Sequence, residues 1–446
     1  MLFDLARPWS LSFPGVTGGS IIMEKSMDWT VLLSRIQFGF TIGFHILFPT
    51  LNIGLAIFLA IMEGIWLKTR RPVYMKICRF WMKIFALTFG MGVVSGLVLS
   101  YELGTNFGSF TAAIGEILGP LFGYEVLTAF FLEAGFLGVM LFGWKKVGPK
   151  LHFMATLMVT IGTVISAFWI ISANSWMQTP TGFHMEGTKY VVSSWTAAIL
   201  NPSFLHRYFH MLLASMVTTS FVVAGVSAWF LVHKRHEVFA RKAMSFALWA
   251  ALILTPTQIF VGDMVGLIVH NYQPIKTAAI EANWNTMNGA PLILFAIPDQ
   301  KHERNLFAVK IPKGASLINT HKLNGKLQGL TSVPRKDRPH VAPVFFTFRI
   351  MVGIGVLLFF VAFYGLFLRW RGTLFTNRLY LKVLPWLTPL GFIATVSGWM
   401  TAEIGRQPWV IYNHMRISDG ASHVPYIHVA ISLASFILVY GVIFSF

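Results

Sequence analysis

Several side chains that can bind metal or carry protons stand inside otherwise apolar stretches of the sequence. A charged group at the centre of a bilayer costs about 2.5–3.5 kcal/mol on insertion scales, so such residues are rare unless they have a function. Imidazole, carboxylate and thioether groups can ligate iron, and the first two can also relay protons. The residues considered first are His45, Glu125, Glu133, His210, Asp263, Met351 and Glu403.

Each of these residues also has an ordinary interpretation. A lone buried histidine often hydrogen-bonds between helices, and most of the 20 methionines should be core residues. Taken together, buried His, Glu and Met fit an iron porphyrin, whose axial ligands can be His or Met. Arg349 and Arg406 would then balance the haem propionates, while the single cysteine, Cys78, excludes an iron–sulfur cluster. From the residues alone, a haem protein and a haem-free transporter or channel both stay open.

The spacing of these residues places some of them on shared helix faces. Glu125 and Glu133 are eight residues apart, about 80° around a helix, so both should face the same half of a bundle. Trp399, Glu403 and Arg406 follow one another at i, i+4 and i+7, which is one stripe of a single helix. The proline two residues later should end that helix.

The elements that carry these residues are long apolar runs. Hydrophobic residues make up 55% of the chain and charged residues 12%, whereas soluble domains carry about 25% charge. A transmembrane helix needs about 20 apolar residues, while a transmembrane barrel would need short alternating segments. The sequence therefore predicts an all-α polytopic membrane protein. We expect nine transmembrane helices, at about 37–63, 84–103, 121–143, 152–174, 208–232, 246–269, 344–368, 383–403 and 425–445.

The basic residues indicate how the chain is oriented in the membrane. The formal net charge is +18. Lys and Arg gather after the first, third, fifth and seventh runs, whereas residues 104–120 contain neither. This is the positive-inside pattern, and it predicts that the N-terminus lies outside and the C-terminus in the cytoplasm. The charge is thus explained by the bilayer and does not indicate a nucleic-acid partner.

The chain divides into a short arm and one membrane domain. Residues 1–26 make a poor signal peptide. We therefore expect that they form a disordered arm or that the natural protein begins at Met27. Residues 27–446 form the membrane domain, in which 270–343 is the one long outer connection. Loops of this length are usually functional or disordered. Its stretches KTAAIEANW and PLILFAIP favour a segment folded onto the membrane surface over a floppy insertion.

Several motifs resemble subunit I of the cytochrome bd-type quinol oxidases. The family signature GRQPW stands intact at 405–409. Similar segments occur in the family's order from about Ser34 to the C-terminus. They are SRIQFGFTIGFHILFP at 34–49, FFLEAGFLG at 130–138, NPSFLHRYFHM at 201–211, APVFFTFRIMVG at 342–353 and GWMTAEIGRQPW at 398–409.

The resemblance implies an oxidase that takes electrons from quinol and reduces dioxygen to water with the help of three haems. His210 and Met351 match the axial ligands of a low-spin haem b. His45 and Glu403 match ligands of the dioxygen-reducing pair, which is a high-spin haem b with either haem d or a third haem b. Which haem of the pair each residue ligates stays open, and Trp399 matches a tryptophan beside the pair.

The resemblance also assigns roles to other charged residues. Glu125 and Glu133 match acids beside the haem pair that relay protons. The segment 270–343 resembles the family's Q-loop, and Lys276 and Glu281 match its quinol-linked lysine and glutamate. The Q-loop is of the short kind, similar to that of the cyanide-insensitive branch.

The resemblance further implies the partners and the location of the chain. Members of the family pair with a second membrane subunit, subunit II, and some carry a very small accessory subunit. They work in the bacterial inner membrane and separate charge across it without a pump. We therefore expect quinol, ubiquinol or menaquinol, and dioxygen as the substrates.

Overall fold

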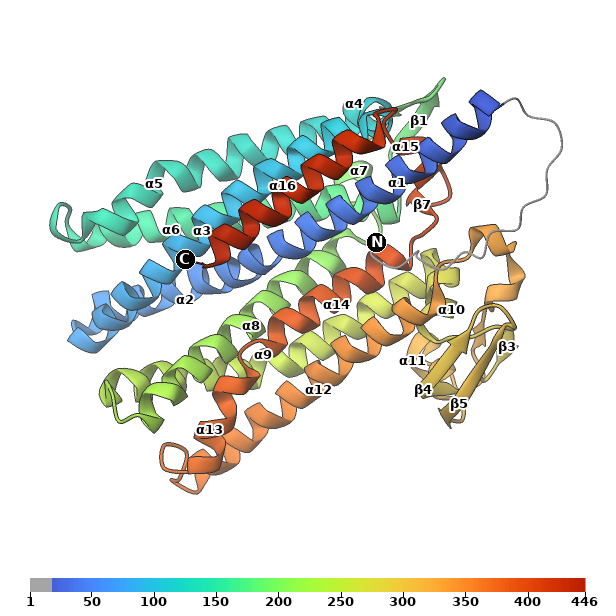
Figure 1. Ribbon diagram of the computed structural model, residues 1–446. Coiled ribbons are helices and arrows are strands. Elements are labelled where there is room, and N and C mark those ends of the chain that lie inside the picture. Colours follow the sequence, from blue (N-terminus) through green and yellow to red (C-terminus); the bar gives the residue numbers. More distant parts are fainter. Residues whose placement is uncertain (1–17, 446) are drawn as a thin grey trace.

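The computed structural model describes residues 18–445, with side chains over 29–442. In that part, long helices form a bundle that is capped at one end by short helices and strands (Figure 1). The helices are α1 Gly18–His45, α2 Leu47–Thr69, α3 Pro72–Asn106, α4 Gly108–Glu125, α5 Phe131–Phe142, α6 Pro149–Gln178, α7 Trp195–Ile199, α8 Phe204–Val232, α9 Glu237–Tyr272, α10 Pro274–Ile280, α11 Gly314–Thr320, α12 Val341–Trp370, α13 Arg378–Leu387, α14 Leu390–Ile404, α15 Ile417–Gly420 and α16 Tyr426–Ser445. The strands are β1 Phe183–Glu186, β2 Lys189–Val192, β3 Met287–Asn288, β4 Leu292–Asp299, β5 Arg304–Ile311, β6 Lys326–Leu327, β7 Trp409–Ile411 and β8 Met415–Arg416. Each strand pairs antiparallel with one other, as β1–β2, β3–β6, β4–β5 and β7–β8.

Eight helical stretches of the described chain are long and apolar enough to cross a membrane. They are Trp29–Thr69, Pro72–Asn106, Gly108–Lys145, Pro149–Gln178, Phe204–Val232, Glu237–Tyr272, Arg335–Trp370 and Arg378–Ile404. They cover the first eight predicted runs, so the polytopic helical fold is confirmed. The predicted ninth run lies on α16, whose described apolar part, Tyr426–Val442, is shorter. The count of nine therefore stays a prediction.

The first helix begins earlier than the sequence pattern indicated. We expected a helix from near Met27, but α1 begins at Gly18. Glu24 and Lys25 interrupt the apolar pattern there, yet both are good helix formers, so hydropathy misses this stretch. Residues 1–17, which hold most of the expected arm, lie outside the described residues.

The first membrane stretch is broken directly after His45. Helix α1 ends at His45, and α2 starts two residues later. The break follows from Pro49, which has no N–H to donate to the carbonyl of His45 four residues earlier. The hydrogen bond from Thr50 N to Ile46 O, at 3.2 Å, restarts the helical pattern. The histidine therefore stands at a helix end inside the apolar stretch.

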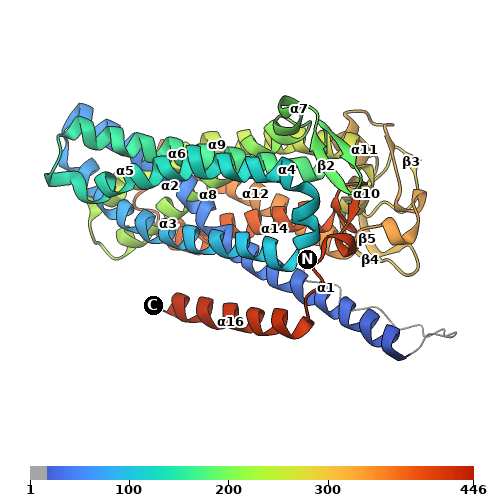
Figure 2. The same ribbon diagram turned by 90° about the horizontal axis from the view of Figure 1, so that it is seen from above.

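Close contacts and a π-helical turn shape the interior of the bundle. Helix α2 packs against α8, and a Cβ atom on Gly54 would lie 2.2 Å from Thr219 Oγ1, so these two central helices touch through their backbones. A π-helical turn, Val126–Phe130, joins α4 to α5. Such turns are rare and are often found at functional sites. In Figure 2, α16 lies beside α1 at the edge of the bundle, and the Phe44 and Tyr440 rings stack at 4.3 Å between these two helices.

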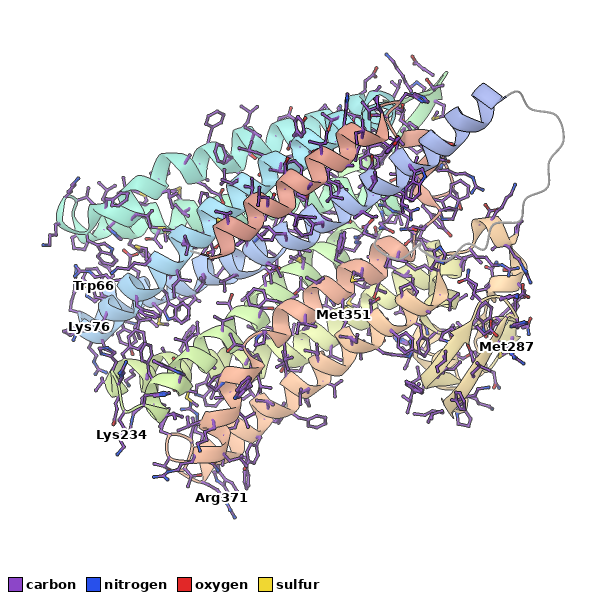
Figure 3. The ribbon with its side chains drawn as sticks, viewed as in Figure 1. Trp66, Lys76, Lys234, Met287, Met351 and Arg371 are labelled. Carbon is purple, nitrogen blue, oxygen red and sulfur yellow. The ribbon has the colours of Figure 1, made fainter. Side chains whose placement is uncertain are left out.

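The long connection 270–343 is folded, so the alternative of a floppy insertion is wrong. It contains α10 and α11, and its PLILFAIP stretch forms β4, which pairs with β5. Figure 3 places Met287 of this connection at one end of the bundle and Lys76, Lys234 and Arg371 at the opposite end. The basic loops and the connection 270–343 thus lie at opposite ends of the helix bundle. The positive-inside pattern of the sequence predicts this separation.

Candidate functional site

His45 is held in one tautomer by helix α3. Its Nδ1 lies 2.9 Å from Ser95 Oγ, and that hydroxyl donates to Met91 O at 2.7 Å. Since the serine proton is used, Nδ1 must carry the proton of the shared hydrogen bond, and Nε2 keeps its lone pair. A hydrogen bond of this kind is what orients a metal-ligating imidazole. A Cβ on Gly96 would lie 3.3 Å from His45 Cε1, so a larger residue there would press on the imidazole.

His210 and Met351 stand on two helices, α8 and α12, with α9 and α14 between them. Both α9 and α14 pack against α8 and against α12. Each intervening helix carries a glycine next to one of the two side chains. A Cβ on Gly262 of α9 would lie 3.2 Å from His210 Cε1, and one on Gly398 of α14 would lie 2.7 Å from Met351 Sδ. His210 Nδ1 has no hydrogen-bond partner among the described residues, while Nε2 lies 3.4 Å from Gln258 Nε2.

Glu403 is the centre of a buried polar network at the strand-capped end. Helix α14 ends at Ile404. Gly405 follows it, and Gln407 disfavours helix because it precedes Pro408. The expectation that Arg406 continues the helical stripe is therefore wrong, although Arg406 still forms an ion pair with Glu403 from the turn. Glu403 Oε1 accepts hydrogen bonds of 3.1 Å from both Asn174 and Gln178 of α6.

Two further cations join this network from other elements. Arg207 of α8 donates from Nη2 to Asn174 Oδ1 at 2.5 Å. Lys276 of α10 donates from Nζ to Gln178 Oε1 at 2.5 Å and to Gln273 Oε1 at 2.6 Å. Burial lowers the pKa of Lys276 well below its usual range, and the positive charge of Arg207 lowers it further. Gln178 thus links Lys276 to the buried acid Glu403.

The charges of the network do not balance among the described residues. Arg207, Lys276 and Arg406 surround one carboxylate, Glu403, and the two arginines alone outnumber it even where burial leaves Lys276 neutral. Arg406 is 7% exposed, and its Nε and Nη1 have no hydrogen-bond partner among the described residues. Buried unpaired donors call for an acceptor. The network thus suits a ligand with carboxylate groups, and Trp399 is partly buried on α14 one turn before Glu403.

Glu281 lies in a second polar cluster, separate from Lys276 in its contacts. It is 3% exposed, its Oε1 accepts from Asn319 Nδ2 at 3.0 Å, and its Oε2 lies 3.5 Å from Arg349 Nη2. Burial raises the pKa of Glu281, and the charge of Arg349 opposes that effect. Arg349 also donates to the carbonyl oxygens of Ile280 and Ile293, at 2.6 and 2.5 Å. Arg349 therefore fixes the connection 270–343 against α12, a role that the sequence did not indicate.

Glu125 and Glu133 both face α6, as their spacing predicts. Glu125 accepts a 2.8 Å hydrogen bond from Ser166 Oγ. Glu133 is 6% exposed and lies near Thr163 of α6, whose hydroxyl donates to Val159 O at 2.9 Å. A Cβ on Gly162 would lie 2.6 Å from Glu133 Cγ, so glycine is required beside it. Glu125 directly precedes the π-helical turn Val126–Phe130, and Glu133 follows the turn by three residues.

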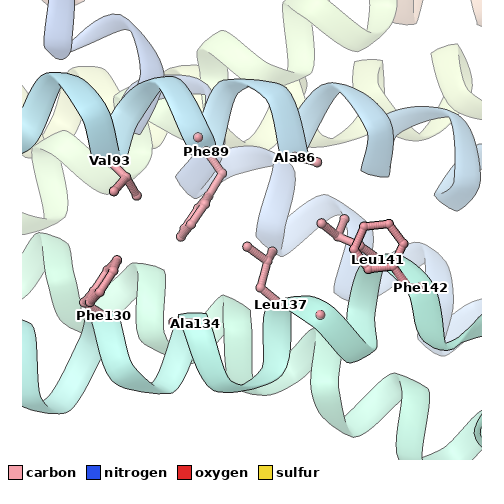
Figure 4. A pocket seen from close by; sticks show the side chains of 10 residues that line it. Ala86, Phe89, Val93, Phe130, Ala134, Leu137, Leu141 and Phe142 are labelled. Carbon is pink, nitrogen blue, oxygen red and sulfur yellow. The ribbon is translucent and has the colours of Figure 1, made fainter.

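Figure 4 shows a pocket of about 400 Å³ between α3 and α5 that is lined by apolar side chains. Phe89 and Val93 of α3 face Phe130, Ala134 and Leu137 across it. Although Ala134 follows Glu133 in the sequence, the acid contacts α6 on another side. This pocket is therefore not part of the polar site.

The family model for cytochrome bd terminal oxidase subunit I matches residues 33–446. The chain belongs to this family. It is 33% identical to cytochrome bd-II ubiquinol oxidase subunit 1 of Escherichia coli strain K12, over 86% of this chain and 88% of that protein. It is 32% identical to cytochrome bd ubiquinol oxidase subunit 1 of Bacillus subtilis strain 168, over 88% and 86%. The structure of bd oxidase from Geobacillus thermodenitrificans superposes with a TM-score of 0.85 at 31% identity, covering 93% of this chain and 95% of that one.

As a cytochrome bd subunit I, the chain is a haem-bearing subunit of a quinol oxidase, a quinol:oxygen oxidoreductase of the bacterial inner membrane. It is one subunit of a multi-subunit enzyme. The resemblance of its motifs is confirmed, and the haem-free transporter is not supported. The residues fit haem: the unpartnered nitrogen of His210 suits an axial ligand, and the unpartnered donors of Arg406 suit propionates.

Proposed function

We propose that this bd oxidase subunit holds its low-spin haem b between His210 and Met351. The observation that carries the proposal is the pair of glycines, Gly262 and Gly398, that leave room beside the two side chains on the intervening helices. The low-spin haem would carry single electrons, and a second haem site, the high-spin pair, would take up dioxygen. For that second site we propose His45 and Glu403 as iron ligands of a high-spin haem b and a haem d or third haem b.

Replacing Met351 with Leu tests the low-spin site. Leucine keeps the apolar bulk but removes the sulfur, and thioether ligation raises the reduction potential of a haem. We expect the low-spin signal to weaken or its midpoint potential to fall in a spectroscopic redox titration of the purified oxidase. Met140, which is fully buried in α5, provides the matched control as Met140→Leu. A titration of Met351→Leu that matches the wild type would rule out Met351 as a ligand.

We propose that the chain crosses the membrane nine times, with the Q-loop outside and the C-terminus in the cytoplasm. Residues 27–446 then form one membrane domain, and quinol, ubiquinol or menaquinol, is oxidised at the outer face. Protons from quinol are released outside and protons for water come from inside, so charge is separated without a pump. Glu125 and Glu133 relay protons to the dioxygen site. The partners are subunit II and, in the fuller assembly, a very small accessory subunit.

Glu281 is the proposed proton acceptor of quinol oxidation. Its Oε2 makes no hydrogen bond among the described residues and lies 3.5 Å from Arg349 Nη2, so this oxygen keeps a lone pair that can accept from a quinol hydroxyl. A carboxyl with a raised pKa is protonated at low pH and becomes an acceptor as the pH rises through that pKa. Quinol-driven turnover should therefore rise with pH over this range.

Glu281→Gln removes that acceptor while keeping the hydrogen bond to Asn319. Quinol-driven turnover should fall by about 10²-fold, and its rise with pH should disappear. An artificial donor that bypasses the Q-loop should still support oxygen uptake. Glu303→Gln, on the same loop and partly exposed, should behave as the wild type. If Glu281→Gln lost as much oxygen uptake with the artificial donor as with quinol, Glu281 would not act in quinol oxidation alone.

A further inference from the structure

A buried acid and a buried imidazole pair up between α2 and α6, far along the bundle from the Q-loop. Glu63 Oε1 lies 2.6 Å from His152 Nδ1, and the two side chains are 0% and 2% exposed. Thr156, one turn along α6, donates to Glu63 Oε2 at 2.6 Å. Isolated buried ionisable groups are costly, and no role described above uses this pair.

The His152 ring nitrogen that faces away from Glu63 contacts no polar protein group among the described residues. His152 Nε2 is buried and has no hydrogen-bond partner among the described residues. The Trp144 ring packs on the imidazole with centroids 3.9 Å apart, and Arg79 lies 5.1 Å from the centroid of Trp144. A buried polar nitrogen without a protein partner indicates a bound water or a proton donor.

The pair lies at the basic end of the bundle. Glu63 is six residues before Thr69, the end of α2, or about 9 Å along the helix axis. His152 is in the first turn of α6, which follows the basic segment GWKKVGPK at 143–150. Under the proposed orientation this end faces the cytoplasm, the side that supplies protons for water.

One face of α6 leads from this pair to Glu133. At about 100° per residue, His152, Thr156 and Thr163 lie within about 40° of one another around the helix. Thr163 follows Gly162, the position at which a Cβ would lie 2.6 Å from Glu133 Cγ, so this face of α6 reaches the acid. From Thr156 to Thr163 the rise is about 10 Å, a distance that a few water molecules span.

We propose that Glu63 and His152 form the inner inlet of a proton path that runs along α6 to Glu133. The inference rests on the proposed function, in which Glu133 relays protons to the dioxygen site. His152 takes a proton at Nε2 and gives one from Nδ1 to Glu63 Oε1. The neutral Glu63 carboxyl then turns so that its protonated oxygen faces Thr156. The Thr156 hydroxyl, which donates to Glu63 Oε2 at rest, reorients to accept this proton and passes its own proton on toward Thr163 and Glu133. One proton enters and one leaves at each step, and no electron moves.

The alternative is that the pair only ties α2 to α6, and Glu63→Gln separates the two roles. Glutamine keeps the shape and the hydrogen-bonding capacity of the tie but cannot exchange an acidic proton. In the purified oxidase complex reconstituted into vesicles, we expect proton uptake from the cytoplasmic side during a single turnover to slow by at least about tenfold. The haem spectrum and the thermal midpoint should match the wild type. Thr255→Val, a buried hydroxyl on α9, is the matched control and should change none of these.

Normal proton uptake in Glu63→Gln, with all haems present, would overturn the inference. The Glu63–His152 pair would then only hold α2 against α6. If Glu63→Gln does not assemble, Thr156→Val decides, because it leaves the Glu63–His152 contact in place. Slow uptake in Thr156→Val supports the path, and normal uptake overturns it. A wild-type complex without haem or oxygen uptake would instead contradict the proposed function itself, so the two failures are distinguishable.

Discussion

Glu133→Gln is expected to reduce dioxygen-linked turnover by at least about tenfold, since a lost acid–base group commonly costs 10²–10⁴-fold. Glu133 is buried against α6, and the membrane stretch Gly108–Lys145 that carries it has no Lys or Arg before its final residue. A buried carboxyl without a cation on its own helix suits an exchangeable proton. Glutamine fits the same space beside Gly162 but does not exchange that proton.

The measurement is oxygen uptake by the purified oxidase with saturating quinol, together with the haem spectrum. The low-spin haem of Glu133→Gln should still be reduced by quinol, because the block comes after it. Glu116→Gln changes an exposed acid of the same membrane stretch and should keep wild-type turnover. Near-normal turnover of Glu133→Gln with a full haem complement would make Glu133 a structural residue.

Glu403→Gln is expected to lose one high-spin haem and to reduce oxygen uptake to background. Glutamine can still accept hydrogen bonds from Asn174 and Gln178, so the network keeps its neutral contacts. It loses the single carboxylate among Arg207, Lys276 and Arg406, and with it the proposed iron ligand. Without this carboxylate the iron of one high-spin haem loses its proposed ligand, so the haem pair should be held poorly.

Haem extraction and the spectrum of the reduced oxidase measure this loss. The low-spin signal should remain, because its proposed ligands lie on α8 and α12. Glu186→Gln, at an exposed position of β1, removes a carboxylate outside the site and should have no effect. If Glu403→Gln kept every haem and its spectrum, Glu403 would be the ion-pair partner of Arg406 and nothing more.

The helical architecture could be predicted because bilayer thickness sets the length of apolar runs. All eight stretches that qualify as membrane spans lie over predicted runs. Local departures from the regular helix were harder to predict. The break after His45 could have been found from Pro49, whose missing N–H faces the carbonyl of His45. The π-helical turn Val126–Phe130 has no comparable signal in the sequence, because it depends on packing against other helices.

The sequence pattern singled out most ionisable residues of the candidate site but missed Arg207 and the neutral residues. Asn174 and Gln178 organise the network around Glu403, but single amides in apolar runs rarely attract notice. Asn174 and Gln178 are four residues apart on one helix, and this spacing could have indicated that the two amides share a face. Arg207, three residues before His210, was not among the residues that the sequence pattern singled out.

Two buried acids were missed for a different reason. Glu63 and Glu102 lie at or next to the last residues of predicted runs, where a pattern cannot separate a buried side chain from an interfacial one. Both are 0% exposed, and Glu102 accepts a 2.5 Å hydrogen bond from Thr41. Tertiary contacts between α1, α2, α3 and α6 decide their burial, and these contacts are not readable from one helix at a time.

The most direct test of this account is the reduced-minus-oxidised spectrum of the purified wild-type oxidase, followed by extraction and identification of its haems. We predict a low-spin haem b together with the high-spin pair, reducible by quinol and reoxidised by dioxygen. A correctly assembled complex that carries no haem, or whose haems quinol does not reduce, would contradict it.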